Sequence, residues 1–513
     1  MFLYNVSSIQ RQFLVPRLVL RADGDATIGL GHLMRLLALA ELLLPMFSDS
    51  VLLIQSPTAP VLALLREVNV AVVELPAGPL QAEATVVLPG LLHATDIVVL
   101  DGYGFDYAYQ VAVRALVARL ICVDDLHAFS FAADLVLNPA GGVSAAAYDL
   151  RAPNARLLSG PAYAPLRSAF SAAQSALASP TQVLVCLGGA DPRQRTRSTV
   201  AALLALPGVA QVHAVVGAAY LAWDELRSWA ATHAGALTLH RALGASELAA
   251  LMRQCGAAVL SPSTISYEYC AAGGGLLLLL PTADNQHDLN QFLRAQGLGL
   301  PYTAAPNVLT AAEAPRLAAQ LRQVQQRYFD GQQGQRLRQE VAALLVPAAP
   351  LRLRLVQPTD SAQLLAWTND PATRQQSFDP APVPAERHEA WLANQLMHPG
   401  KYLLLLAETI DTQEPAGLIR FALSTVPGSA TPTATLGYSL GLAYRGRGWA
   451  APLLLAGTRA VLAYWPQVAQ VRGDVKADNI ASVRAFERAG FAEVAGSGPE
   501  GSRTFAWTAA PAA

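Results

Sequence analysis

Short apolar runs separated by helical stretches make up the first two thirds of the chain. Most of these runs are apolar at successive positions rather than at alternate ones. Continuous apolarity is typical of strands that are buried on both faces, and therefore of a parallel sheet. Two series of such runs predict two α/β units. We predict strands at residues 18–20, 51–54, 70–73, 97–100 and 120–123 in the first series, and at 183–187, 214–217, 257–260 and 276–280 in the second.

The pattern changes at residues 346–350, a stretch of Pro and Ala that is typical of a linker. Residues 351–355 then alternate between apolar and charged positions, which indicates a strand with one solvated face. In the rest of the chain we predict helices at 360–367 and 451–462, and a third helix that follows Asn479 and runs through Glu487. We also predict a hairpin of 402–407 with 417–421, strands at 436–440 and 471–475, and a last hairpin that begins at residue 490.

The predicted organisation is an α/β chain with two Rossmann-like halves followed by an α+β domain. Residues 157–167 are expected to cross between the halves in extended form, and residues 311–345 to close the second half as a helical stretch. The expected parts are an N-terminal tail at 1–16, the first half at 17–170, the second half at 171–345, the linker at 346–350 and the last domain at 351–513.

Composition excludes several classes of protein. The 513 residues include 53% hydrophobic and 14% charged residues, which indicates a globular chain rather than a disordered one. The formal net charge of −1 shows no basic surplus of the kind that binds nucleic acid or membranes. The four cysteines have no metal-ligand spacing, so we expect no metal; three of them lie in or beside apolar runs and are expected to be buried thiols. Because no apolar run is long enough for a signal peptide or a membrane span, we expect a cytoplasmic protein.

One stretch near the start of the chain has the arrangement of a ligand site. After the first predicted strand comes a loop with Gly29 and Gly31, and a Leu- and Ala-rich helical pattern covers residues 33–44. A glycine turn between a strand and a helix aims backbone N–H groups at a phosphate or a sugar. His32 stands at the start of the helix, where a neutral imidazole can accept a proton. A structural helix cap is the alternative role for His32.

Polar side chains follow the other predicted strands of the first half. Asp101 and Tyr103 come after the strand at 97–100, and Asp124 and Asp125 come after the strand at 120–123. The carboxyl ends of parallel strands meet at one edge of a sheet, so these side chains are candidates for one site. Helix capping or turn formation is an equally good explanation of Asp124 and Asp125.

The second half repeats this arrangement. Gly188 and Gly189 follow its first strand, and a helix further along opens with small hydroxyl side chains. The first turn of a helix leaves free N–H groups that suit a diphosphate. Ser263 and Thr264 are therefore candidate diphosphate contacts and Glu268 is a candidate ribose contact. Ordinary N-capping and a capping box are the alternatives for these three residues.

Motifs of the two halves match one family in order along residues 17–345. The region resembles the UDP-sugar hydrolases of pseudaminic acid biosynthesis. The matching stretches are Gly29-Leu30-Gly31-His32-Leu33-Met34-Arg35, Asp101-Gly102-Tyr103, Val123-Asp124-Asp125-Leu126, Leu187-Gly188-Gly189-Ala190-Asp191-Pro192 and Ala283-Asp284-Asn285-Gln286.

This resemblance implies a glycosyltransferase-B-like fold that cleaves UDP from 2,4-diacetamido-2,4,6-trideoxy-β-L-altropyranose by attack of water at the anomeric carbon. It implies catalytic roles for His32, Tyr103 and Asn285, the last two in the sugar site. The family usually has a glycine-rich loop where this chain has Ser261-Pro262, and proline removes one N–H donor. Contacts to the substrate or to UDP are expected from Gly31, Arg35, Asp101, Gly188, Gly189, Ser263, Thr264, Glu268 and Gln286.

Two stretches of the last domain carry a second resemblance, one at residues 445–450 and one at 476–491. Through them, residues 351–508 are similar to the N-acetyltransferases of the acetyl-CoA-dependent GNAT superfamily. The glycines at 446 and 448 suit a loop whose N–H groups bind a pyrophosphate. The resemblance implies that acetyl-CoA is bound by Arg445, Gly446, Arg447, Gly448, Trp449, Ala450 and Asn479.

The acceptor side of the last domain resembles the branch that acts on 4-amino nucleotide sugars. This resemblance places Asn369 and His388 at the acetyl-acceptor site, with a structural histidine as the alternative for His388. The branch usually has arginine where Thr368 stands. Many relatives have a tyrosine acid where this chain has Phe486, and phenylalanine has no proton to donate.

The two resemblances imply consecutive reactions in one bifunctional enzyme. Acetylation of the 4-amine of a UDP-4-amino-4,6-dideoxy sugar would give the diacetamido sugar that the hydrolase family consumes. The expected partners are UDP-amino sugars and acetyl-CoA, with no nucleic acid, membrane or metal. Three alternatives stay open. The first alternative is that residues 17–345 form a glycosyltransferase, and the second is that the last domain acetylates a protein amine. The third is that either region binds sugar without catalysis.

Overall fold

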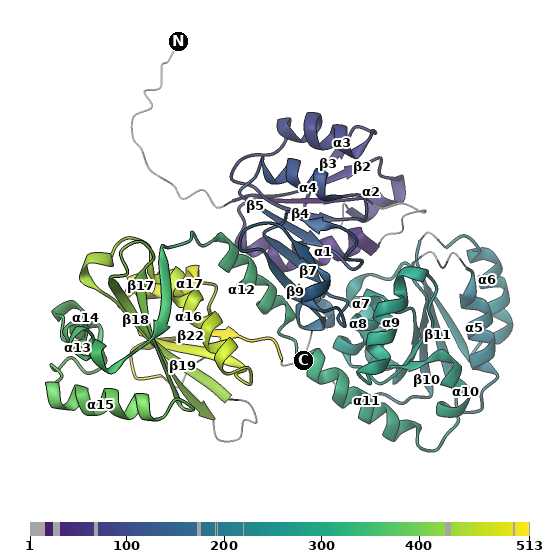
Figure 1. Cartoon of the computed structure of the whole chain (residues 1–513). Helices are drawn as coiled ribbons and strands as arrows, with labels where there is room; N and C mark the ends of the chain where they lie inside the picture. Colours follow the sequence, from purple (N-terminus) through teal and green to yellow (C-terminus); the bar gives the residue numbers. More distant parts are fainter. Residues whose placement is uncertain are drawn as a thin grey trace, which may run out of the picture. The chain divides into compact units, whose positions relative to one another are not determined.

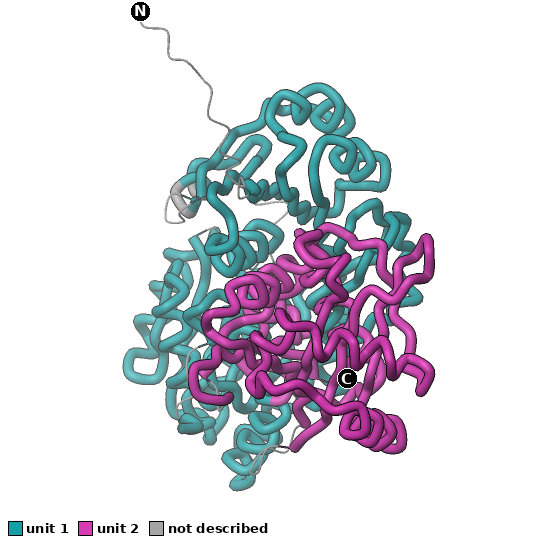
Figure 2. Tube along the Cα trace, turned by 90° about the vertical axis from the view of Figure 1, so that its left-hand side faces the viewer, with its two compact units in different colours: residues 1–160, 164–326 teal, residues 161–163, 327–513 magenta. Residues whose placement is uncertain are grey.

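The computed structural model describes residues 16–23, 31–65, 70–171, 176–189, 191, 193–218, 220–425, 432–495 and 498–511. The chain forms two compact units. Unit 1 comprises residues 1–160 and 164–326, and unit 2 comprises residues 161–163 and 327–513 (Figure 2). The predicted mixed α/β class with parallel sheets is confirmed in unit 1.

The first sheet of unit 1 has seven parallel strands in the order β3-β2-β1-β4-β5-β7-β9 (Figure 1). The five predicted strands are present, and β7 and β9 extend the sheet beyond them. The segment predicted to cross in extended form thus begins as a sheet strand. The strands are β1 (Leu18–Ala22), β2 (Ser50–Gln55), β3 (Ala71–Leu75), β4 (Ile97–Asp101), β5 (Arg119–Val123), β7 (Leu135–Asn138) and β9 (Arg156–Ser159), with a short pair β6 (Ser130–Phe131) and β8 (Asp149–Leu150). The helices are α1 (Gly31–Leu43), α2 (Ala59–Leu65), α3 (Leu80–Ala82) and α4 (Tyr107–Arg114).

Strand order places a ligand site at one point of this sheet. Chain order runs outward from β1 on one side and from β4 on the other, so the connections diverge between these two strands. Ligands of open α/β sheets bind at such a switch point, beyond the carboxyl ends of the strands. Here α1 follows β1, and Asp101 is the last residue of β4.

The second sheet of unit 1 has six parallel strands in the order β12-β11-β10-β13-β14-β15, and its switch point lies between β10 and β13. β12 and β15 were not predicted. The strands are β10 (Gln182–Cys186), β11 (Gln211–Val216), β12 (Leu237–Arg241), β13 (Ala257–Leu260), β14 (Leu276–Leu279) and β15 (Leu300–Pro301). The helices are α5 (Arg195–Leu204), α6 (Trp223–Ala230), α7 (Ala245–Gln254), α8 (Thr264–Ala272), α9 (His287–Ala295), α10 (Ala305–Val308) and α11 (Ala314–Tyr328).

Unit 2 contains a mixed seven-stranded sheet in the order β16-β17-β18-β19-β20-β22-β21. Its neighbours are antiparallel except β19 and β20, which are parallel and pair only through residues 433–435 and 470–472. The strands are β16 (Leu351–Leu355), β17 (Tyr402–Thr409), β18 (Pro415–Thr425), β19 (Pro432–Leu440), β20 (Gln470–Lys476), β21 (Ala492–Val494) and β22 (Ser502–Thr508). The helices are α12 (Gln333–Leu345), α13 (Ser361–Thr368), α14 (Pro371–Gln376), α15 (Ala385–Met397), α16 (Ala450–Tyr464) and α17 (Ile480–Arg488).

The helical stretch predicted at 311–345 is two helices that belong to different units. α11 lies in unit 1, whereas α12 lies in unit 2 and bonds to the last strand of its sheet. Gln335 donates to the Thr508 hydroxyl at 3.1 Å, and Arg336 donates to the carbonyl oxygen of Ala509 at 2.9 Å. The stretch 346–350 therefore connects two elements of unit 2.

All four cysteines are buried thiols, as the apolar runs around them predicted for three of them. In the described part of the chain, no helix combines the length and the apolar character needed to cross a membrane.

Candidate functional site

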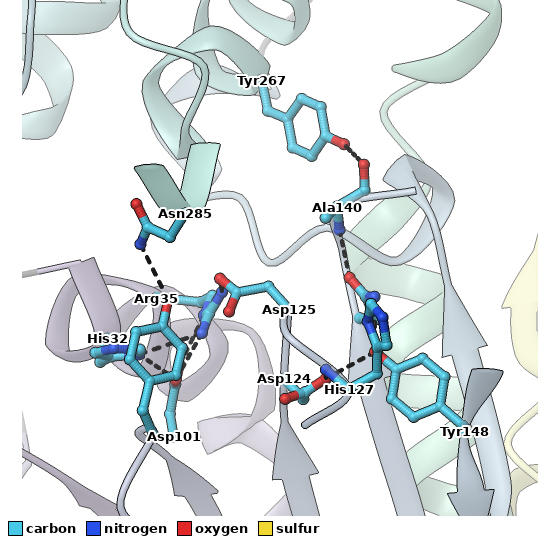
Figure 3. Close-up of polar contacts among 12 residues, drawn as sticks. His32, Arg35, Asp101, Asp124, Asp125, His127, Ala140, Tyr148, Tyr267 and Asn285 are labelled. Carbon is cyan, nitrogen blue, oxygen red and sulfur yellow. Dashed lines mark hydrogen bonds and ion pairs between the residues drawn. The ribbon is translucent and has the colours of Figure 1, made fainter. Parts of the chain in front are cut away.

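His32 is the second residue of α1 and lies against the end of β4. Its Nδ1 is 2.7 Å from Oδ1 of Asp101 (Figure 3). Because a carboxylate only accepts hydrogen bonds, Nδ1 carries a proton, and in the neutral imidazole Nε2 has the free lone pair. Both side chains are buried, and Asp101 has no exposed surface. The loop with Gly29 that precedes α1 lies outside the described residues.

Arg35 fixes the carboxylate of Asp101 from the next turn of α1. Residues three apart share one face of a helix, so Arg35 reaches the same strand end as His32. Its Nε donates to Oδ2 of Asp101 at 2.7 Å and its Nη2 to Oδ1 at 2.6 Å. Burial on its own would raise the pKa of Asp101, but the charge and hydrogen bonds of Arg35 outweigh it and lower the pKa. Asp101 therefore stays ionised beside His32.

Tyr103 connects His32 with Asn285. The two rings pack edge to face with 4.5 Å between their centroids, and Nδ2 of Asn285 donates to the Tyr103 hydroxyl oxygen at 3.1 Å. Tyr103 follows β4 of the first sheet, whereas Asn285 lies after β14 of the second. Burial, helped by the charge of Asp125, raises the pKa of Tyr103 to about 12, so the phenol stays protonated at neutral pH. The three residues predicted to be catalytic thus come together from two sheets.

Asp125 belongs to this cluster, although the sequence left its role open. Its Oδ2 accepts from Arg35 at 2.9 Å, while its Oδ1 is buried with no hydrogen-bond partner among the described residues. Asp124 instead forms the turn: its Oδ2 accepts from the Tyr148 hydroxyl at 2.8 Å and from the backbone N–H of His127 at 2.7 Å. Adjacency of β4 and β5 is the signal that links Asp125 to the site. An apolar cavity next to the cluster is lined by Gly102, Tyr103, Phe105, Asp124, Leu126 and Phe129, among others.

The second sheet presents its predicted residues at its own switch point. Gly188 has φ +95°, and an added Cβ there would meet no atom within 4 Å. Ser263 precedes α8, and its N–H donates to the carbonyl oxygen of Ser261 at 2.8 Å. One N–H group expected to face a diphosphate is therefore engaged within the loop. Thr264 is the first residue of α8, where the first-turn N–H groups begin.

Three predicted contacts of the second half are engaged within the protein. Glu268 is buried and accepts from Arg167 at 2.7 Å; burial raises its pKa even though Arg167 opposes this. Oε1 of Gln286 accepts from the N–H of Thr282 at 2.7 Å. Gly189 accepts from the N–H of Gly217 at 2.9 Å. Contacts from these residues to a nucleotide stay a prediction.

The glycine-rich loop of unit 2 leads into α16. Gly446 and Gly448 have φ +74° and +78°, a region that favours glycine, and nothing lies within 4 Å of a Cβ added to either. Arg445 is engaged within the unit, because its Nη1 donates to Asp370 at 2.7 Å and its Nε to the carbonyl oxygen of Leu440 at 3.0 Å. The Arg445 contact to acetyl-CoA also stays a prediction.

Aromatic rings flank this loop. Tyr444 and Trp449 stack with 5.1 Å between their centroids, and the Arg447 guanidinium lies 5.5 Å from one ring centroid and 5.6 Å from the other. Ala450 is the first residue of α16. The loop therefore exposes backbone N–H groups at a helix start, beside a cation held by two rings.

Near the start of α17, Asn479 caps the helix by accepting from the N–H of Ser482 at 3.1 Å. Phe486 lies further along the same helix and is buried. Tyr438 of β19 was not singled out from the sequence: its hydroxyl lies 3.0 Å from Oγ of Ser482 and its ring packs edge to face on Phe486. Tyr438 lies three residues beyond the last pairing of β19 with β20.

The two predicted acceptor-site residues make structural contacts. Asn369 donates to the carbonyl oxygen and accepts from the N–H of Val383, both at 2.8 Å. His388 is buried on α15 with Nε2 3.1 Å from the carbonyl oxygen of Ser361, and burial lowers its pKa despite that hydrogen bond. Among the residues that the structure describes, no group of His, Cys, Asp or Glu side chains could hold a metal ion.

Several known proteins are similar to part of the chain. Among solved structures that resemble the chain, the aminoglycoside acetyltransferase AAC(6')-Ib, in complex with paromomycin and acetyl-CoA, is 20% identical, with 31% of this chain and 94% of that chain covered and a TM-score of 0.27. The spermidine N-acetyltransferase from Vibrio cholerae, in complex with CoA and spermine, is 16% identical, with coverage of 31% and 95% and a TM-score of 0.27. No curated protein sequence matches the chain.

A family model gives the assignment. The family described as acetyltransferase (GNAT) domain matches residues 350–492, which run from β16 through α17 and end at the first residue of β21. The match includes the glycine-rich loop before α16 and the capped start of α17. The C-terminal part of the chain is therefore an acetyltransferase domain of the GNAT family.

Proposed function

We propose that the chain catalyses two consecutive steps on a nucleotide sugar, in pseudaminic acid biosynthesis. The GNAT domain transfers an acetyl group from acetyl-CoA to the 4-amine of a UDP-4-amino-4,6-dideoxy sugar. Unit 1, as a glycosyltransferase-B-like pair of sheets, then hydrolyses UDP from the resulting UDP-2,4-diacetamido-2,4,6-trideoxy-β-L-altropyranose. The observation that carries the hydrolase proposal is the His32–Asp101–Arg35 cluster, with Tyr103 and Asn285 brought to it from two sheets.

In the hydrolytic step, Nε2 of His32 takes a proton from water as the water oxygen bonds to the anomeric carbon. The bond from that carbon to the UDP oxygen breaks, and UDP leaves with the electron pair. Asp101 holds the imidazole in the required tautomer and stabilises the imidazolium that forms. Direct displacement inverts the anomeric centre.

The leaving diphosphate needs its charge neutralised more than it needs a strong acid. The helix start at Thr264 and the open backbone at Gly188 support this role at the carboxyl edge of the second sheet. On the sugar side, Asn285 and Tyr103 offer an amide and a phenol. The unpartnered Oδ1 of Asp125 gives a sugar hydroxyl an acceptor.

In the acetyl transfer, the amine nitrogen bonds to the thioester carbonyl carbon and the carbon–sulfur bond breaks. The nitrogen loses a proton to water, and the CoA thiolate takes up a proton from the protein. Backbone N–H groups between Gly446 and Ala450 bind the CoA pyrophosphate. We assign this proton to the Tyr438 hydroxyl, because Phe486 has none and Tyr438 packs against Phe486 beyond the point where β19 pairs with β20.

The test separates the two activities in the full chain. With the UDP-4-amino sugar and acetyl-CoA, His32→Ala should still release CoA but accumulate the acetylated UDP-sugar, with UDP release slowed about 10²- to 10⁴-fold. His93→Ala, which changes an exposed histidine of the same unit, is the matched control and should release both products at the wild-type rate. Near-normal UDP release by His32→Ala contradicts the hydrolase assignment. UDP release only on addition of a sugar acceptor supports a glycosyltransferase instead.

A further inference from the structure

Among the described residues of the GNAT domain, no carboxylate pairs with Arg420 of β18. Its side chain is open to solvent, yet enough protein surrounds it for desolvation to lower its pKa, and no charge or hydrogen bond offsets the effect. The guanidinium lies over the Trp391 ring of α15, with 5.6 Å between the guanidinium carbon and the ring centroid. Because the guanidinium is exposed and no described carboxylate pairs with it, it is free to bind an anion.

Other arginines of this domain show the contrast. Arg354 is paired with Glu408 at 2.6 Å, and Arg445 with Asp370 at 2.7 Å. Arg503 also lies over an aromatic ring, that of Phe505, but it is paired with Glu493 at 2.7 Å. Arg420 differs from these three arginines in having no carboxylate partner among the described residues.

The position of Arg420 connects it to the predicted acceptor side. Arg420 lies opposite Gly437 of β19, and a Cβ on Gly437 would come within 3.2 Å of the Arg420 Nε. The guanidinium therefore lies beside Gly437, two residues beyond Thr435, at which the pairing of β19 with β20 ends. The ring under it comes from α15, the helix that also carries His388.

That stretch of β19 has one edge without a strand partner in the described structure, and its free N–H and C=O groups suit the amides of an extended ligand such as the pantetheine arm of acetyl-CoA. An acceptor amine that reaches the thioester there would pass close to the guanidinium. A polycationic amine would be repelled by it, whereas a phosphate ester would be attracted.

We propose that Arg420 binds the diphosphate of the acetyl acceptor, so that the GNAT domain selects a phosphate-bearing amine over a neutral or polycationic one. This inference rests on the proposed acetyltransferase step and names the group that its acceptor must carry. Arginine suits the role because its planar fork donates two hydrogen bonds to a phosphate.

The test compares three acceptors in the full chain: UDP-2-acetamido-4-amino-2,4,6-trideoxy-β-L-altrose, the methyl glycoside of the same amino sugar, and spermidine. Arg420→Gln should raise the KM for the UDP-sugar about 10- to 100-fold and leave the KM for acetyl-CoA and for the glycoside unchanged. Arg420→Lys should restore part of the loss. Arg503→Gln, the matched control over an aromatic ring, should change none of these values.

Two outcomes overturn the role of Arg420 while the acetyltransferase step stands. One is an unchanged KM of Arg420→Gln for the UDP-sugar, and the other is an equal rise for the UDP-sugar and the glycoside. A wild-type chain that acetylates spermidine but not the UDP-sugar overturns the anionic acceptor itself. A wild-type chain that does not bind acetyl-CoA, measured by calorimetric titration, overturns the proposed function at an earlier step, whatever Arg420 does.

Discussion

Replacing Asp101 by asparagine tests the contact on which the hydrolase proposal depends. The carboxylate accepts three hydrogen bonds, one from His32 and two from Arg35. An asparagine has one acceptor oxygen and one NH₂ group at that place. With the oxygen toward His32, only the Nε of Arg35 faces a donor; with the NH₂ toward His32, both the Nη2 of Arg35 and the imidazole tautomer are disturbed. The first orientation is therefore favoured, and His32 keeps its proton on Nδ1.

The expected loss follows from that orientation. A wrong tautomer costs about 10⁴-fold in kcat in the serine-protease triad. Here the tautomer survives and the loss is the negative charge that stabilises the imidazolium, so we expect kcat for UDP release to fall about 10²-fold with little change in KM. Breaking the buried ion pair between Asp101 and Arg35 should also lower the free energy of unfolding by about 3–5 kcal/mol.

The assay measures UDP release from the diacetamido UDP-sugar, with urea unfolding as the second readout. Asp96→Asn is the matched control, because it also removes a buried carboxylate bonded to an arginine, Arg17 at 2.6 Å, but before β4 rather than at its catalytic end. It should lose stability and keep kcat. The double variant His32→Ala with Asp101→Asn should be no slower than His32→Ala alone. The reasoning would be refuted if the kcat losses of the two single variants multiply in the double variant, or if Asp101→Asn keeps the wild-type kcat.

Four further predictions follow from the same contacts. Asn285→Ala should slow UDP release with the fold intact; unchanged rate and affinity would leave Asn285 a turn residue. Gly448→Glu should abolish calorimetric binding of acetyl-CoA, because it puts bulk and negative charge at φ +78° in the loop. A fragment of residues 327–511 should unfold at a higher temperature than one of 351–511, since α12 bonds to β22. Because folding lowers the pKa of Asp101, this carboxylate stabilises the folded chain at pH values above its pKa in the unfolded chain. That stabilisation is lost as the pH falls below about 4. The urea midpoint should therefore drop less below pH 4 in Asp101→Asn than in wild type.

The buried strands were predicted well from the sequence because a continuous apolar run of this length is typical of a strand that is buried on both faces. β1, β4, β10 and β13 lie inside their sheets and are buried along their whole length, except for the first residue of β10. β12 was missed because it lies at a sheet edge, where Leu237–Arg241 is partly exposed and carries polar residues. The split between α11 and α12 was missed because both are amphipathic, and only tertiary packing assigns them to different units.

The candidate site shows the same division. Strand ends located Asp101 and Tyr103, since a parallel sheet gathers its carboxyl ends. The side-chain partners could not be predicted from the sequence. Nothing in the spacing indicates that Asp101 is hydrogen-bonded to His32, or that Glu268 is paired with Arg167. Arg420 was not singled out at all, because the absence of a partner becomes visible only when the neighbouring side chains are placed.

The most direct test of the central claim follows one reaction mixture over time by mass spectrometry. The full chain is given UDP-2-acetamido-4-amino-2,4,6-trideoxy-β-L-altrose, with and without acetyl-CoA. With acetyl-CoA, the account predicts that the acetylated UDP-sugar rises first and then gives way to UDP and the free diacetamido sugar; without acetyl-CoA, the starting UDP-sugar persists. Release of UDP without acetylation, or an acetylated UDP-sugar that is never hydrolysed, would contradict it.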